Sequence, residues 1–165
     1  MDTVNYLLQI KKTKYKHILV VLIIALLVLL FAYTGMSKFL DYDKFVFQMR
    51  LAPVPLMKKL APFLGWVVPS IEILIAMGFA VGVYLHSIKI KALYASVILL
   101  LVFEFYIAAM LLSGSNLPCT CGGIVSQMGW KQHLFFNGFF ILTGILSIKY
   151  LQKQKTTSPI EHRGR

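Results

Sequence analysis

Charged residues are scarce in this sequence, and acidic ones are the scarcest. Asp and Glu together number six against 17 Lys and Arg, and charged residues of both signs make up 14% of the chain. Ordinary soluble domains contain about 25% charged residues. With 58% hydrophobic residues and a mean hydropathy of +0.75, the composition excludes a soluble globular domain and indicates an integral membrane protein.

Cysteine is also scarce, because Cys119 and Cys121 are the only two in the chain. No second cysteine pair is present to complete a zinc site, so we predict no metal centre. The chain also lacks a haem-attachment Cys-x-x-Cys-His motif and a nucleotide-binding loop. A bound cofactor would therefore have to be lipophilic or absent, and the second electron carrier would be either a membrane quinone or another thiol protein.

A cleavable signal peptide is a further feature that we do not find. Residues 1–17 are polar and basic and precede an apolar run, as in a signal peptide, but the run from residue 18 is too long and no small-x-small cleavage site follows it. We therefore predict a first membrane span over residues 18–38. The apolar segments 63–85, 92–113 and 132–151 predict three more.

A short amphipathic segment lies between the first two spans. Residues 41–51 place Phe45, Val46 and Met49 at helical spacing among charged residues, which is typical of a helix lying in the membrane surface. The predicted fold is an all-α membrane protein: a four-helix transmembrane bundle over residues 18–151 with this short interfacial helix. A basic segment, 1–17, precedes the bundle, and a basic tail, 152–165, follows it.

The basic residues flank apolar segments and do not gather in one patch, which favours a lipid bilayer over a nucleic-acid partner. Four spans place both termini on one side, and most Lys and Arg residues belong to that side. The positive-inside rule then predicts cytoplasmic termini in a bacterial inner membrane. Cys119 and Cys121 would face the oxidising compartment, where disulfides persist.

The cysteine pair is the strongest candidate for a catalytic site. A disulfide between Cys119 and Cys121 closes a very small ring, so it would be strained and easily reduced, which favours redox work. Gly122 and Gly123 permit a tight exposed turn at this point, and Pro118 fixes the chain before it. Two free thiols without a redox role, or half of a metal site, are the alternatives.

Polar residues inside the predicted spans are the supporting candidates. Glu72 and Glu104 are intramembrane acids, which normally face the bundle interior as functional groups or as polar clamps between helices. Lys38, near the end of the first span, is expected to extend to the membrane interface. His133 and Asn137 share one face of the last span, where His133 is either an interfacial residue or a proton carrier for a thiolate.

Several of these residues stand in an order that resembles the MauE branch of the MauE/DoxX-type membrane proteins. The similar motifs are Gly35, Lys38, Phe39, Asp41 and Phe45 at the end of the first span, Pro69 and Glu72 in the second, Cys119, Cys121 and Gly123, and Asn137 in the fourth. The resemblance covers about residues 18–151. Thr120 and Gly122 depart from it, because the family usually has Gly and Phe there.

The resemblance implies a four-helix protein associated with periplasmic redox and disulfide maturation, including that of methylamine dehydrogenase. The predicted function is a thiol/disulfide redox protein that serves an extracytoplasmic partner, either thioredoxin-like or amine dehydrogenase-like. One alternative is a non-enzymatic assembly factor for a periplasmic redox protein. Another is a small proton-coupled transporter that uses Glu72 and Glu104.

Overall fold

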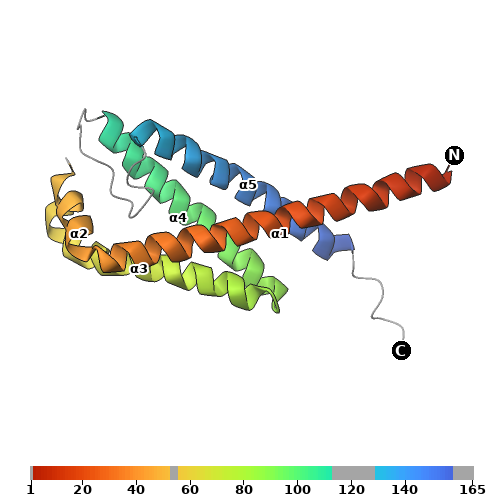
Figure 1. Ribbon diagram of the computed structural model, residues 1–165, viewed down its shortest axis with the longest axis horizontal. Helices are drawn as coiled ribbons and strands as arrows, with labels where there is room; N and C mark the ends of the chain where they lie inside the picture. The colour runs from red at the N-terminus through yellow and green to blue at the C-terminus, as the bar shows by residue number, and fades with distance from the viewer. Residues whose placement is uncertain (1, 53–55, 113–128, 158–165) are drawn as a thin grey trace.

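The computed structural model describes residues 2–52, 56–112 and 129–157, in which helices joined by short turns are the only regular secondary structure (Figure 1). Four helices are long and apolar enough to cross a membrane, which makes this a multi-pass membrane protein and confirms the predicted fold class. The helices are α1 (Asp2–Leu40), α2 (Tyr42–Leu51), α3 (Met57–Gly82), α4 (His86–Leu112) and α5 (Trp130–Thr157).

The long helices extend beyond the predicted spans. α1 is continuous from Asp2, so the basic segment before the first span is helical, and α5 continues to Thr157. The third span was predicted to begin at residue 92, but α4 already begins at His86. The turn can be this tight because Gly82 lies against Lys89: a Cβ on Gly82 would come within 2.8 Å of the Lys89 Cα.

The four long helices pack in the order α1, α3, α4, α5. α1 begins and α5 ends at the same end of the bundle, where the two helices lie together, and they diverge toward the other end (Figure 1). Their contact includes a 3.4 Å hydrogen bond from the Tyr150 hydroxyl to the Thr13 carbonyl. The main core is apolar, and its most buried side chains are Leu27, Phe31, Phe79 and Leu93.

The short helix α2 confirms the element predicted between the first two spans, and it packs against the first part of α3. Val46 and Met49 contact Ala61 in a small apolar cluster separate from the main core. The Tyr42 hydroxyl donates a 3.0 Å hydrogen bond to the Pro62 carbonyl. Gly65 permits this close packing, since a Cβ there would lie 2.5 Å from Val46 Cγ2.

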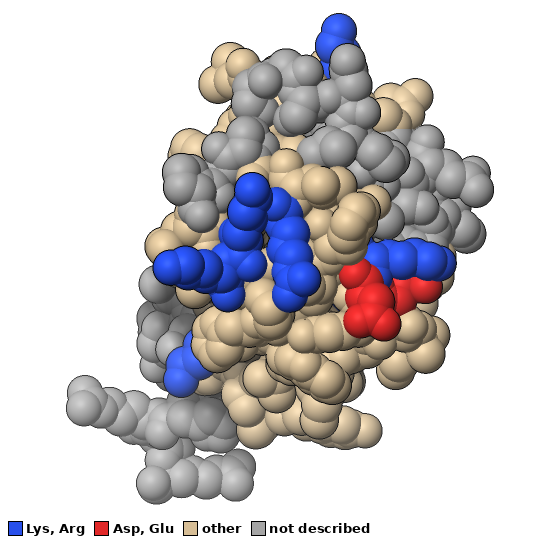
Figure 2. Space-filling model, turned by 90° about the vertical axis from the view of Figure 1, so that its left-hand side faces the viewer, with Lys and Arg blue, Asp and Glu red and all other residues tan. Residues whose placement is uncertain are grey.

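Basic side chains are exposed at the end of the molecule that carries α2. Figure 2 views this end and shows separate groups of basic side chains, with a small acidic group beside one of them. Lys44 there pairs with Asp41 at 3.0 Å, and its side chain is 73% exposed. The exposed basic residues of α2 and the start of α3 are Lys44, Arg50, Lys58 and Lys59.

Candidate functional site

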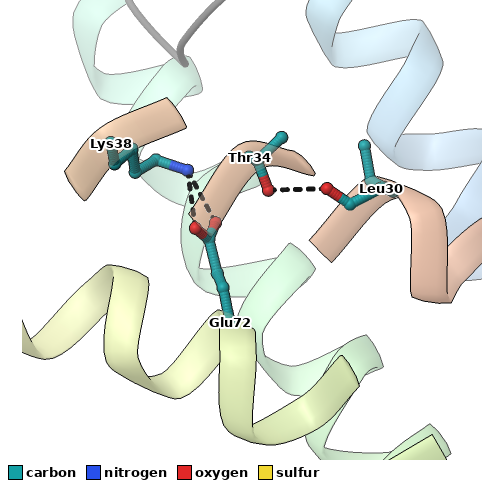
Figure 3. A network of polar contacts seen from close by, with 4 residues as sticks. All are labelled: Leu30, Thr34, Lys38 and Glu72. Atoms are coloured by element: carbon teal, nitrogen blue, oxygen red, sulfur yellow. Dashed lines mark hydrogen bonds and ion pairs between the residues drawn. The ribbon is translucent and has the colours of Figure 1, made fainter. Parts of the chain in front are cut away.

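A buried ion pair joins α1 to α3. The Lys38 Nζ lies 2.6 Å from Oε1 and 2.9 Å from Oε2 of Glu72, and the two residues are 3% and 1% exposed (Figure 3). The expectation that Lys38 extends to the membrane interface is therefore wrong. Its side chain turns into the bundle because Glu72 offers the opposite charge there, and two buried charges in apolar surroundings stabilise each other.

Gly35 brings the two helices close enough for this pair to form. A Cβ placed on Gly35 would lie 3.1 Å from Ile73 Cγ1 and 3.2 Å from the Glu72 Cβ. A larger residue would push α1 away from α3 at the level of the ion pair. The sequence signal for this contact is a single small residue, one turn before Lys38.

Thr34 and two aromatic rings complete the surroundings of the ion pair. The Thr34 hydroxyl donates a 2.9 Å hydrogen bond to the Leu30 carbonyl (Figure 3) and also interacts with the Glu72 carboxylate. The Lys38 Nζ lies 5.7 Å from the centre of the Phe45 ring and 5.3 Å from that of Phe103. Groups from α1, α2, α3 and α4 therefore converge on one ammonium.

A second set of polar groups lies on α4 and α5. His133 and Asn137 are 5% and 3% exposed, and they lie one helical turn apart as predicted. The Asn137 amide approaches the Glu104 carboxyl across the α4–α5 interface. His133 is close enough to Lys38 for an electrostatic interaction, so the two sets of polar groups are neighbours.

Three atoms of this second set lack a hydrogen-bond partner in the described structure: Glu104 Oε2, Asn137 Nδ2 and His133 Nδ1. The Asn137 amide thus faces Glu104 without reaching normal hydrogen-bond geometry. A buried polar atom without a partner costs about 1–3 kcal/mol. These three atoms are therefore available to pair with something else.

The remaining predicted site residues lie outside the described residues. Cys119, Cys121, Gly122 and Gly123 belong to the segment that connects the end of α4 to the start of α5. Among the described residues, no group of three or more His, Cys, Asp and Glu lies close enough together to hold a metal ion.

Sequence reasoning missed two features of the site, the pairing of Lys38 with Glu72 and the rings around it. The available signal was that each residue carries a charge in an apolar span and needs a partner of opposite sign. Phe103 carried no comparable signal, because phenylalanine is common in membrane helices.

A sequence model of the family described as "Methylamine utilisation protein MauE" matches residues 16–150 of the chain. The chain belongs to the MauE family. This match confirms the resemblance and includes every residue of the two polar sets. No curated protein and no solved structure matches the chain. In this MauE-family protein, the buried polar residues all lie within the part of the chain that the family model matches.

Proposed function

We propose that this protein is a membrane thiol/disulfide redox protein that supports disulfide formation in an extracytoplasmic partner during methylamine utilisation. The Cys119–Cys121 disulfide would take two electrons from two partner thiols, leaving the partner with a disulfide and this protein with two thiols. Returning to the disulfide would transfer two electrons and two protons to a quinone of the membrane, giving the quinol. The proposed partner is thioredoxin-like or amine dehydrogenase-like.

One observation carries this proposal: two sets of buried polar groups lie together in an apolar bundle, at the end where the cysteine-bearing segment is attached. Ionisable residues inside a membrane protein are costly and usually mark a functional site. The two sets are adjacent, because His133 of one set interacts electrostatically with Lys38 of the other. His133 lies in the first turn of α5, the helix that follows the segment with Cys119 and Cys121, and its imidazole would carry protons for their thiols.

The proposed orientation supports this chemistry. Both termini would lie in the cytoplasm of a bacterial cell and the cysteines on the opposite side of the inner membrane. The compartment there is oxidising, and a strained disulfide with one residue between its cysteines would be able to oxidise the thiols of a partner.

The test uses the purified full-length protein with dithiothreitol as electron donor and decylubiquinone as acceptor, followed through quinone absorbance. The parent protein should accelerate quinone reduction, and the Cys119→Ser/Cys121→Ser variant should show only the uncatalysed rate. Thr120→Ser is the matched control, because it changes the intervening residue and keeps both thiols. Equal rates for the parent and the double serine variant would rule out the redox function.

A second candidate, a non-enzymatic assembly factor, is favoured by the exposed basic side chains on α2 and the start of α3. Such a surface suits an acidic partner protein. In that case the double serine variant would still mature its partner in cells, while charge reversal at Lys58 and Lys59 would reduce maturation.

A further inference from the structure

The unpaired atoms on α4 and α5 point to a ligand. His133 and Asn137 are both more than nine-tenths buried, and each presents a ring or amide nitrogen without a partner, as does the Oε2 atom of Glu104. Inside a membrane, water does not freely compensate such groups, so they usually pair with other protein groups or with a bound molecule. Although Asn137 approaches Glu104, none of the three atoms makes a hydrogen bond of normal geometry within the described chain.

The hydrogen-bonding capacity of the three groups limits the ligand chemistry. The Asn137 Nδ2 is only a donor, the His133 Nδ1 donates in one of its neutral tautomers, and Glu104 Oε2 donates when the carboxyl is protonated. An alkylammonium ligand is also a donor and would leave the Asn137 amide unpaired. A ligand that presents carbonyl oxygens satisfies all three groups.

The surroundings limit the ligand further. The His133 ring lies 6.4 Å from that of Phe136 at a tilt of 32°, and Phe136 meets Phe140 edge-on at 5.0 Å, so the groups lie beside aromatic rings in an apolar bundle. The charged neighbours, Lys38 and Glu72, form an ion pair without net charge, so the site suits an uncharged ligand. A planar, lipophilic and uncharged molecule with carbonyl oxygens has the chemistry of a quinone.

We propose that Glu104, His133 and Asn137 bind the carbonyl oxygens of a membrane quinone. Its role as electron acceptor rests on the redox function proposed above, whereas binding itself rests only on the unpaired groups. When the quinone is reduced, two thiols lose two electrons and two protons to form the disulfide, and the two carbonyl oxygens take up the protons. The product is the quinol, and no further reactant is needed.

The experiment measures binding without turnover. The full-length Cys119→Ser/Cys121→Ser protein in lipid nanodiscs is titrated with decylubiquinone, and the infrared carbonyl stretch of the bound quinone is recorded. We expect saturable binding and a carbonyl stretch shifted to lower frequency by the hydrogen bonds. Asn137→Leu and His133→Phe should each weaken binding about tenfold, the value of one hydrogen bond, and reduce the shift.

Ser147→Ala is the matched control. Ser147 is 1% exposed on the same helix, but its hydroxyl donates to the Thr143 carbonyl of α5 at 2.8 Å, so the variant should bind quinone like the parent. Thermal unfolding separates ligand binding from a structural role. Asn137→Leu removes an unpaired buried amide, so the protein without quinone should be at least as stable as the parent.

Two results would overturn the site: unchanged quinone affinity in Asn137→Leu and His133→Phe, or saturable binding of methylammonium in place of quinone. Loss of stability together with loss of binding in Asn137→Leu would assign that residue to packing and would also count against the proposal. A third result would separate the two proposals. If quinone binds as expected but the parent and the double serine variant reduce it at equal rates, the binding site stands and the redox function is rejected.

Discussion

At the scale of single residues, the ion pair between Lys38 and Glu72 is the most consequential contact that the structure describes. Each charge alone would be costly in this apolar environment, and together they form a neutral unit with two short hydrogen bonds. The pair therefore stabilises the fold because each charge neutralises the other. Removing one partner leaves the other charge buried and unpaired, and only then is the protein strongly destabilised.

Removing one partner should be more harmful than removing both. Lys38→Met or Glu72→Leu alone should lower the free energy of unfolding by about 3–5 kcal/mol, while Lys38→Met/Glu72→Leu should come close to the parent. The measurement is unfolding in detergent followed by circular dichroism. Asp41→Asn, which breaks the exposed pair with Lys44, should cost about 1 kcal/mol or less.

A double variant that is as unstable as the single ones would contradict this account. In that case the two side chains would contribute packing or specificity that apolar residues cannot replace, and mutual neutralisation would not explain their presence.

The sequence indicated the polar residues of the predicted spans better than it indicated the surroundings in which the structure places them. Glu72, His133 and Asn137 were identified from their apolar surroundings, and all three are buried. The depth of Lys38 was not predictable, because it depends on how closely Gly35 lets α1 approach α3 and on the ring of Phe103 from a distant helix. Such contacts arise from tertiary packing, which hydrophobic periodicity does not encode.

At the scale of elements, glycine positions determine how closely helices pack. Gly65 faces Val46 and Tyr42 of α2, whereas a Cβ on Gly138 of α5 would meet nothing within 4 Å. Helix existence was predictable from apolar run length. Helix ends were not predictable. The basic residues before the apolar run of α1 mark the start of the membrane span, but the helix itself already begins at Asp2.

Gly65→Val should push α2 away from α3 and destabilise the protein. The added Cβ alone would lie 2.5 Å from Val46 Cγ2 and 2.8 Å from Tyr42 Cε2, so the helices must separate, at a cost of about 1–3 kcal/mol. Gly138→Val is the control and should be close to neutral. Thermal unfolding of both variants decides the matter, and equal stability would show that α2 tolerates displacement without cost.

At the scale of the whole molecule, the number of apolar spans was predictable from hydropathy. α1 begins at the end of the bundle where α5 ends, as an even number of spans requires (Figure 1). The convergence of four helices on Lys38 was not predictable, because it needs the packing order of the helices. The site proposed at Cys119 and Cys121 lies outside the described residues and stays a prediction.

The orientation proposed from the basic residues can be measured directly. A membrane-impermeant thiol reagent should label reduced Cys119 or Cys121 in intact spheroplasts. In the double serine background, a cysteine introduced as Lys153→Cys should be labelled only after the inner membrane is opened. The opposite pattern would invert the orientation and place the cysteine pair in the reducing compartment.

Pro69 interrupts the hydrogen bonds of α3 between its two packing regions. Proline has no N–H to offer the Gly65 carbonyl, so α3 bends more easily there than along an unbroken helix. On one side of this point α3 packs with α2 in the small cluster, and on the other side it belongs to the main core. Glu72 follows Pro69 by less than one helical turn. A partner protein that displaced α2 would therefore bend α3 at Pro69, and the ion pair between Glu72 and Lys38 would resist that bending.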